Sequence, residues 1–282
     1  MLVLGAIQDL KKINELLDLW SEAGADGVIF TVPIDLLDPV FFDDAKTARD
    51  RGLRVALHPF EIGRAIYTPT DTDTHAFMLE KLALAMDNIK SLGLEQFLII
   101  HPPRLAAPDT TLCGKKEVDE RTALENSTPF YDKLSRIASQ SSIMIAIENM
   151  HDPYANPGHS LYGYNVEQLD SICSKRGFGI CVDTGHAKLS MTSVSEYLNS
   201  TLNIVTVHLQ GNDGSYDQHM LPNMKNVGDV EGVMRLLSLN VPIIIETSSP
   251  YLLKRADESW EGVVSEVSET IQAVRKRTLP PG

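Results

Sequence analysis

The sequence predicts a single-domain α/β protein built as a (β/α)8 barrel. Strand-like and helix-like segments alternate along the whole chain, and the strand-like runs are short and continuously apolar. Such runs are typical of a parallel sheet that helices cover on both sides. Eight strand–helix units within 282 residues fit one closed barrel. No linker, repeat or low-complexity segment divides the chain, so one domain is expected over residues 1–282.

A doubly wound open sheet is the alternative architecture. Such a sheet usually carries a glycine-rich phosphate-binding turn directly after its first strand. Residues 6–9, which follow the first strand-like run, contain no glycine. The closed barrel is therefore the favoured architecture.

The apolar runs and the helical patterns between them give the expected elements. Strands are expected over residues 1–6, 27–32, 54–60, 97–103, 143–150, 178–187, 203–210 and 242–248. Helices are expected over residues 9–23, 39–51, 78–92, 128–140, 229–238 and 259–277, with two more beginning near residues 165 and 193. Asp38 before Pro39 is a typical helix start, and Gly93 is a typical helix stop.

Composition indicates the compartment. Hydrophobic residues make up 43% of the chain and charged residues 22%, which is ordinary for a globular protein. No apolar run approaches the roughly 20 residues of a membrane span, and the N-terminus does not resemble a secretory leader. The cysteines Cys113, Cys173 and Cys181 have no paired spacing and are expected to be reduced thiols. A cytoplasmic protein without a membrane partner is expected.

The charge of the chain bears on its partners. The formal net charge is −13. A strongly acidic surface is a poor electrostatic footprint for nucleic acid. A small molecule is therefore the expected partner. By analogy with other barrels of this size, a homodimer is the expected assembly.

Six of the strand-like runs end in a side chain that can bind a metal ion. These side chains are His58, His101, Glu148, Asp183, His208 and Glu246. In a (β/α)8 barrel the carboxyl ends of all strands converge on one face, where active sites lie. Carboxylates and imidazoles are the usual ligands of Zn, Mn, Co or Fe. The last four residues follow successive strands about 4.8 Å apart, so they can close on a single ion.

A structural role is the competing interpretation for each of these residues. A lone histidine after a strand is more often a satisfied polar residue than a ligand. Glu148 and Glu246 are different, because each ends an aliphatic run where an unpaired carboxylate is costly. An ion pair with lysine or arginine would explain them, but no basic residue stands at any other of these strand ends. Six such side chains in register predict a metal site.

Several other polar residues have both a functional and a structural interpretation. His186 lies in the polar cluster that ends the sixth strand, and Asp217-Gln218-His219 can return over the site from the loop at 211–226. His75 is expected to be exposed, His151 and His159 to lie in a solvated loop, and Cys181 to be a packing residue. No nucleophile elbow, P-loop or dinucleotide fingerprint accompanies them.

Together these motifs resemble the xylose isomerase-like TIM-barrel superfamily, which includes sugar phosphate isomerases and epimerases and the endonuclease IV group. The motifs are His58-Pro59, His101-Pro102, Ile147-Glu148-Asn149, Val182-Asp183-Thr184-Gly185-His186-Ala187, Val207-His208-Leu209, Asp217-x-His219 and Ile245-Glu246-Thr247. They occur in order over nearly the whole chain. The resemblance is specific for the superfamily and less specific for the reaction.

For a ketose epimerase, the resemblance implies one divalent ion, Mn, Co or Zn, held by Glu148, Asp183, His208 and Glu246. The two glutamates would exchange the substrate proton, one removing it beside the carbonyl and the other returning it on the opposite face. His186 would orient the substrate oxygens. The implied activity is metal-dependent isomerisation or epimerisation of a sugar or sugar phosphate.

For endonuclease IV, the resemblance implies three zinc ions and cleavage of phosphodiesters at apurinic or apyrimidinic sites. The further ligands would be His58, His101, His186, Asp217 and His219. The chain departs from that group's motifs at Met150-His151, at Gly185 and at Gln210-Gly211. We therefore expect a sugar isomerase or epimerase, with the endonuclease as the alternative. Only the endonuclease hypothesis requires a nucleic-acid partner. Arg104, Lys115, Lys116 and Lys188 are candidate phosphate contacts, with solvated surface charge as the competing interpretation.

Overall fold

The protein is a closed eight-stranded parallel barrel surrounded by helices. The computed structural model describes residues 1–60, 69–103, 119–151 and 162–282. The strands pair in chain order, and β8 pairs with β1 to close the ring. They are β1 (Val3–Ile7), β2 (Gly27–Pro33), β3 (Arg54–Phe60), β4 (Phe97–Ile100), β5 (Met144–Glu148), β6 (Gly179–Asp183), β7 (Ile204–Leu209) and β8 (Ile243–Ile245). The predicted fold class is confirmed.

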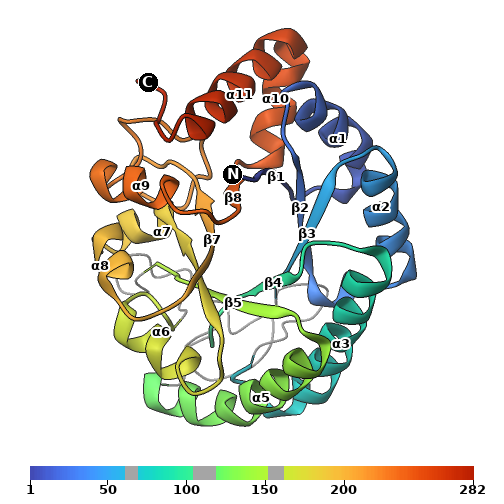
Figure 1. Ribbon diagram of the computed structural model, residues 1–282, viewed down its shortest axis with the longest axis vertical. Coiled ribbons are helices and arrows are strands. Elements are labelled where there is room, and N and C mark those ends of the chain that lie inside the picture. Colours follow the sequence, from blue (N-terminus) through green and yellow to red (C-terminus); the bar gives the residue numbers. More distant parts are fainter. Residues whose placement is uncertain (61–68, 104–118, 152–161) are drawn as a thin grey trace.

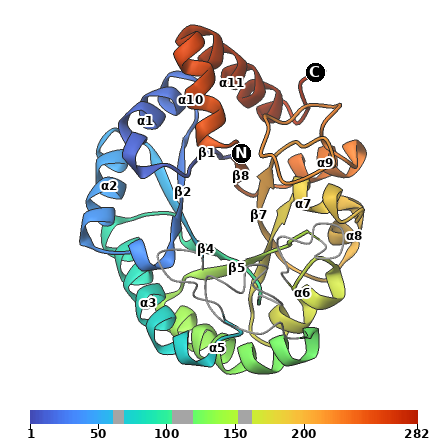
Figure 2. The same cartoon turned by 180° about the vertical axis from the view of Figure 1, so that it is seen from behind.

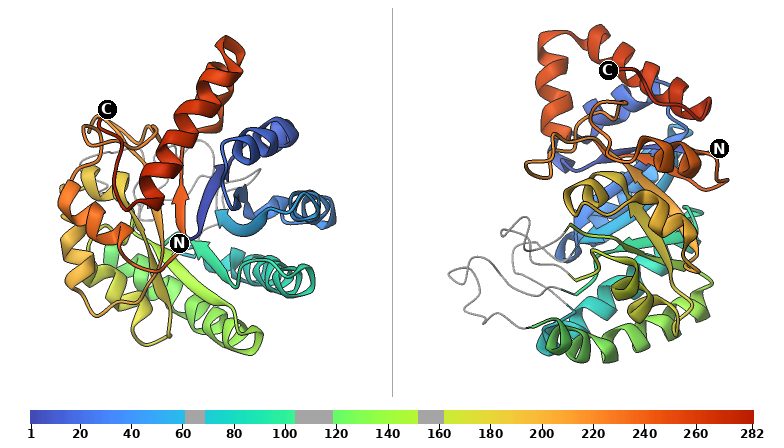
Figure 3. Two further views of the ribbon diagram at one scale, coloured as in Figure 1. Left: turned by 45° about the horizontal axis from the view of Figure 1, so that its top comes forward. Right: turned by 90° about the vertical axis from the view of Figure 1, so that its left-hand side faces the viewer.

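The helices form the outer layer of the barrel (Figures 1 and 2). They are α1 (Ile13–Glu22), α2 (Pro39–Asp50), α3 (His75–Leu92), α5 (Glu120–Ser141), α6 (Val166–Cys173), α7 (Thr184–Leu189), α8 (Val194–Asn199), α9 (Val230–Leu237), α10 (Ser249–Glu258) and α11 (Trp260–Arg275). Short 3-10 turns precede α1 at Leu10–Lys12, α2 at Ile34–Leu36 and α3 at Thr72–Thr74. Figure 3 shows α1, α2 and α3 side by side around the strands. No helix in the described ranges combines the length and hydropathy of a membrane span.

Two apolar layers hold the barrel together. The larger layer lies between the strands and the helices. A smaller cluster fills the barrel interior and includes Leu4, Ala6, Ile29, Ile99 and Ile244. The alternation of side chains along each strand produces this division. The polar side chains at the carboxyl ends of the strands therefore pack against apolar side chains of the barrel interior.

Close packing explains one glycine in the first strand. A Cβ atom on Gly5 would lie 1.9 Å from the indole of Trp20. Trp20 is fully buried on α1, and its Nε1 donates a hydrogen bond to the Ala6 carbonyl at 3.2 Å. The absence of a side chain at position 5 lets α1 lie directly on β1.

Several predicted boundaries agree with the structure. Asp38 accepts a hydrogen bond from the Phe41 amide and begins α2, and Gly93 ends α3 at φ +64°. Ser193 and Glu196 form a capping box at the start of α8. These local signals act through backbone hydrogen bonds at helix ends, where the helix itself leaves groups unsatisfied.

Other boundaries were predicted wrongly. The sixth strand ends at Asp183 rather than residue 187, because the Asp183 carboxylate accepts from the His186 amide and begins α7. Helix α5 begins at Glu120, eight residues before the predicted start. Helix α10 was not predicted. His75 is buried rather than exposed, with its Nε2 2.6 Å from the Pro69 carbonyl.

Candidate metal centre

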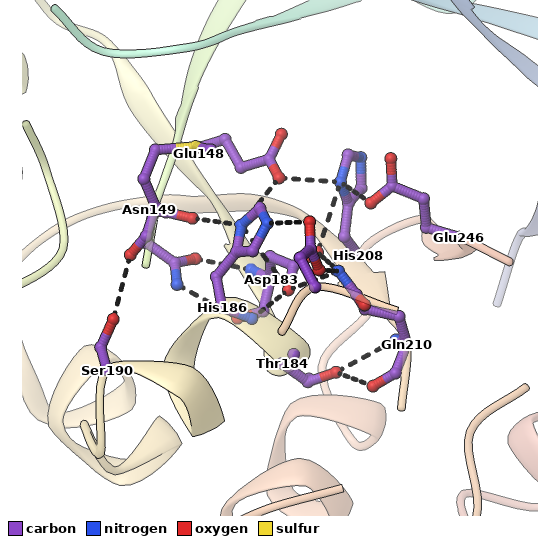
Figure 4. Close-up of polar contacts among 12 residues, drawn as sticks. Glu148, Asn149, Asp183, Thr184, His186, Ser190, His208, Gln210 and Glu246 are labelled. Atoms are coloured by element: carbon purple, nitrogen blue, oxygen red, sulfur yellow. Dashed lines mark hydrogen bonds and ion pairs between the residues drawn. The ribbon is translucent and has the colours of Figure 1, made fainter. Parts of the chain in front are cut away.

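Four side chains from successive strands meet at the carboxyl end of the barrel. Glu148 ends β5, Asp183 ends β6, His208 lies near the end of β7, and Glu246 follows β8. One ligand atom from each lies within 4.8 Å of the others. All four are buried, with 0–3% of each residue exposed. We call these four residues the inner group (Figure 4).

One imidazole nitrogen lies at the centre of the inner group. His208 Nδ1 is 2.8 Å from Glu246 Oε2, 3.3 Å from Glu148 Oε1 and 3.8 Å from Asp183 Oδ2. These contacts are ion pairs, and within the described residues Glu148 Oε2, Glu246 Oε2 and both His208 nitrogens form no hydrogen bond of good geometry. Buried polar atoms without hydrogen bonds are costly. A divalent cation coordinated by these atoms would remove that cost, so the donor set fits a metal ion.

The electrostatics of the inner group also favour a cation. Burial raises the pKa of Glu246, but the nearby His208 and His219 outweigh burial and lower it to about 2. Burial raises the pKa of Asp183 to about 7, and the negative charges of Glu148 and Glu246 add to this rise despite His186. Three carboxylates cannot all be ionised in so small a volume without positive charge.

Without a metal, histidine protons supply part of that positive charge. Burial lowers the pKa of His208, but the neighbouring carboxylates of Glu246 and Glu148 outweigh burial and hold the pKa well above its usual value. Burial likewise raises the pKa of Glu148, and the positive charge of His208 outweighs it, leaving this pKa well below its usual value. A bound metal would take over the role of these protons.

A second cluster lies beside the inner group and comes from α7 and the loop at 211–226. His186 Nε2 is 3.2 Å from Asp217 Oδ2, and His219 Nε2 is 2.8 Å from the same oxygen. Backbone carbonyls contact the other ring nitrogens. The carbonyl oxygen of Asn149 lies 2.9 Å from His186 Nδ1, and the carbonyl oxygen of Glu246 lies 3.2 Å from His219 Nδ1. We call His186, Asp217 and His219 the outer group.

A pair of histidines completes the site on the opposite side of Glu148. His58 Nε2 is 3.2 Å and His101 Nε2 is 3.7 Å from Glu148 Oε2. His58 Nδ1 lies 3.1 Å from the Ile99 carbonyl. These three residues also form a set with metal-ligand spacing. All nine candidate residues therefore lie together, as the strand ends and the Asp-x-His motif predicted.

Sequence reasoning missed three buried residues of the site. His151 was expected in a solvated loop, but it is 2% exposed and its ring centroid lies 5.3 Å from that of His186. Asn149 Nδ2 donates to the Asp183 carbonyl at 3.1 Å, and Asn149 Oδ1 accepts from the Asp183 amide at 2.6 Å. Gln210 Nε2 donates to Asp183. For Asn149 the only available signal was its place directly after the predicted ligand Glu148, and Gln210 appeared only as a departure from a related motif.

Lys188 is neither a solvated surface charge nor part of a loop. It lies on α7, and its Nζ donates to the Asn212 carbonyl at 2.5 Å and to the Asn226 carbonyl at 2.9 Å. Asn212 and Asn226 are themselves paired, since the Asn212 amide donates to the Asn226 carbonyl. Lys188 therefore joins the two ends of the loop that carries Asp217 and His219. Arg104, Lys115, Lys116, Cys113 and His159 lie outside the described residues.

The fold and site define a (β/α)8-barrel protein with a buried carboxylate–histidine cluster at the carboxyl ends of its strands. Comparison with family models identifies the family. The model described as xylose isomerase-like TIM barrel matches residues 17–272, so the chain belongs to the xylose isomerase-like TIM-barrel family. No curated protein sequence matches the chain.

Solved structures show the same fold at low sequence identity. D-psicose 3-epimerase from Clostridium cellulolyticum, determined with D-tagatose, has a TM-score of 0.68 at 10% identity, covering 99% of both chains. A D-tagatose 3-epimerase-like protein has a TM-score of 0.66 at 18% identity, covering 96% of this chain and 100% of its own. A Thermus thermophilus protein soaked with ZnCl2 has a TM-score of 0.64 at 21% identity, covering 98% of both chains.

Proposed function

We propose that the protein is a divalent-metal-dependent isomerase or epimerase of a sugar or sugar phosphate. The observation that carries the proposal is the placement of two buried carboxylates, Glu148 and Glu246, on either side of His208 Nδ1. Two carboxylates that flank one reacting carbon can remove a proton from one face and return it to the other. Family membership supports the same chemistry.

The inner group would hold the metal, which is Mn, Co or Zn by the chemistry of its ligands. When bound, such an ion supplies positive charge against the negative charge that develops on the substrate oxygens. One of the two carboxylates, Glu148 or Glu246, would accept the proton from one face of the reacting carbon, and the other, already protonated, would donate its own proton to the opposite face.

His186 would orient the substrate in this reaction. Its Nδ1 is 3.3 Å from Glu148 Oε1, and its Nε2 faces Asp217 in the outer group. The imidazole of His186 thus lies between Glu148, a proposed acid–base residue, and Asp217 of the outer group. Sugar hydroxyls require hydrogen-bond partners on both sides of the reacting carbon, and the outer group supplies them on this side.

The test is epimerisation by protein that has been stripped of metal and then reloaded. The substrates to screen first are D-tagatose, D-psicose and L-ribulose, which appear in the names of structurally similar proteins, and their phosphate esters. Product is followed by chromatography after loading with Mn, Co or Zn. Activity that appears only with metal supports the proposal. No conversion of any ketose by protein with a full inner group would reject it.

A phosphodiesterase that acts at abasic sites is the second candidate. The orientation of three histidines favours it. His58, His186 and His219 each present Nδ1 to a backbone carbonyl and Nε2 to a carboxylate. Metal-bound histidines commonly present one ring nitrogen to a backbone carbonyl in this way, so Nε2 of each of these three histidines could bind a zinc ion. About three zinc ions per chain, together with nicking of a duplex that holds an abasic site, would establish this function instead.

A further inference from the structure

Gln210 connects the inner and outer groups through a single amide. It follows β7 directly and is fully buried. Its Nε2 donates to Asp183 Oδ2 at 3.0 Å and Oδ1 at 3.2 Å, and to Asp217 Oδ1 at 3.1 Å. Figure 4 shows the amide beside the Asp183 carboxylate. The acid–base chemistry proposed above assigns Gln210 no role.

An amide suits this position because it donates to two carboxylates without adding charge. Asp217 has one oxygen on Gln210, which turns its other oxygen toward His186 and His219. Asp183 Oδ1 also accepts from the His186 amide at 2.6 Å. The Gln210 contact therefore limits rotation of both carboxylates. A glutamate at this position would place a third negative charge between them.

The backbone and a neighbouring glycine hold the amide in place. Thr184 Oγ1 donates to the backbone carbonyl of Gln210 at 3.0 Å and accepts from the backbone N–H of Gln210 at 3.1 Å. A Cβ atom on Gly185 would lie 2.5 Å from Gln210 Cδ and 2.7 Å from its Oε1. The long side chain of Gln210 thus fits only because residue 185 has none.

We propose that Gln210 is a positioning residue that orients Asp183 and Asp217, and that Gly185 is required to make room for it. The proposal rests on the proposed metal centre, because Asp183 is one of its four ligands. Residues that orient a metal ligand usually affect metal affinity by about 10–100-fold when they are replaced. Replacing Gln210 is expected to lower metal affinity by an amount in this range, although Gln210 itself does not contact the metal.

The primary test is the zinc and manganese affinity of Gln210→Leu, which keeps most of the volume and removes the donor. Metal-stripped protein is titrated against a chromogenic chelator. A loss of about 10–100-fold in affinity is expected. The matched control is Gln272→Leu, because Gln272 lies on α11 and its Nε2 donates to Ser268, outside both groups. The control should bind metal like the wild type.

Thermal unfolding of the metal-free proteins separates positioning from general stability. A structural role alone would lower the unfolding temperature of Gln210→Leu and leave its metal affinity unchanged, which would overturn the proposal. Gln210→Asn keeps the amide but withdraws it by one methylene, so it should also lose affinity. If the wild type binds no metal, the proposed function fails; if it binds metal and both Gln210 variants match it, only the positioning role fails.

A double-mutant cycle tests the coupling to Gly185. Gly185→Ala should lower metal affinity about as much as Gln210→Ala, because the methyl group displaces the amide. The double variant should lose no more than either single variant, since the shared contact is already gone. Losses that add would show that the two residues act independently and would overturn this part of the proposal.

Discussion

The inner and outer groups are built from the same residue types but are held in different ways. The inner group comes from strand ends whose register the closed barrel fixes, and Asp183 and His208 are directly paired across β6 and β7. The outer group comes from α7 and a loop, and its Asp217 and His219 side chains are 20% exposed. The buried and rigidly held inner group is suited to proton transfer, and the partly exposed outer group is suited to substrate contacts. The difference implies that the two groups respond differently to substitution.

The largest effect is expected when the inner group loses a ligand. His208→Ala removes the nitrogen that lies within 3.8 Å of three carboxylates. Metal affinity should fall by more than about 100-fold, beyond the range for residues that only orient ligands, and epimerisation should disappear. Chelator competition and a product assay measure both. Wild-type metal affinity in this variant would contradict the assignment of the inner group.

The outer group is expected to tolerate the same change better. His219→Ala should leave the inner metal bound and lower kcat/KM by about 10–100-fold, because a substrate contact is lost rather than a metal ligand. The measurement is metal content by elemental analysis together with steady-state kinetics. A fall in stoichiometry of one ion per chain would instead place a metal in the outer group and favour the phosphodiesterase.

Metal binding should release protons. The pKa of His208 is raised well above its usual value in the metal-free protein, so this side chain carries a proton at neutral pH that a metal must displace. Affinity should therefore rise with pH, by about tenfold per pH unit for each proton displaced. Calorimetric titration in two buffers with different ionisation enthalpies counts the protons. Identical heats in both buffers would show that none is released.

A smaller effect is expected at the base of the loop. Lys188→Met removes the ammonium that joins the carbonyls of Asn212 and Asn226. The free energy of unfolding should fall by about 1 kcal/mol, which is typical of a partly exposed hydrogen bond, and KM should rise while inner metal affinity is kept. Lys254→Met, which alters an exposed lysine on α10, is the control. A change in inner metal affinity would mean that the two groups are not separable.

The inner group could be predicted from sequence because strand ends in a parallel barrel converge. An aliphatic run that ends in a carboxylate, as at Glu148 and Glu246, is an unusual pattern with a clear physical cost. The outer group gave a weaker signal, since Asp217 and His219 lie in a polar loop whose path the sequence does not define. Their contact with His186 depends on packing of the loop against α7.

Tertiary packing accounts for what the sequence did not predict. Pro129 is typical of a first helical turn, yet α5 begins at Glu120 and is capped by Asp119. Helix α10 buries only Ser249 and Leu252, so few core positions mark it in the sequence. Gly185 and Gln210 were noticed only as departures from a related motif. In the structure these two residues are neighbours, because a Cβ atom on Gly185 would meet the Gln210 side chain.

Hydrogen exchange at the reacting carbon tests the central claim most directly. Glu148→Gln and Glu246→Gln, each confirmed to hold metal, are incubated in D2O with either epimer of a ketose substrate, and deuterium incorporation is followed by NMR. Interconversion should fall by about 10²–10⁴-fold in both variants. Each variant should still exchange one epimer, the one whose proton faces the remaining carboxylate, and the two variants should retain opposite epimers. Full interconversion in either variant would contradict proton transfer between Glu148 and Glu246.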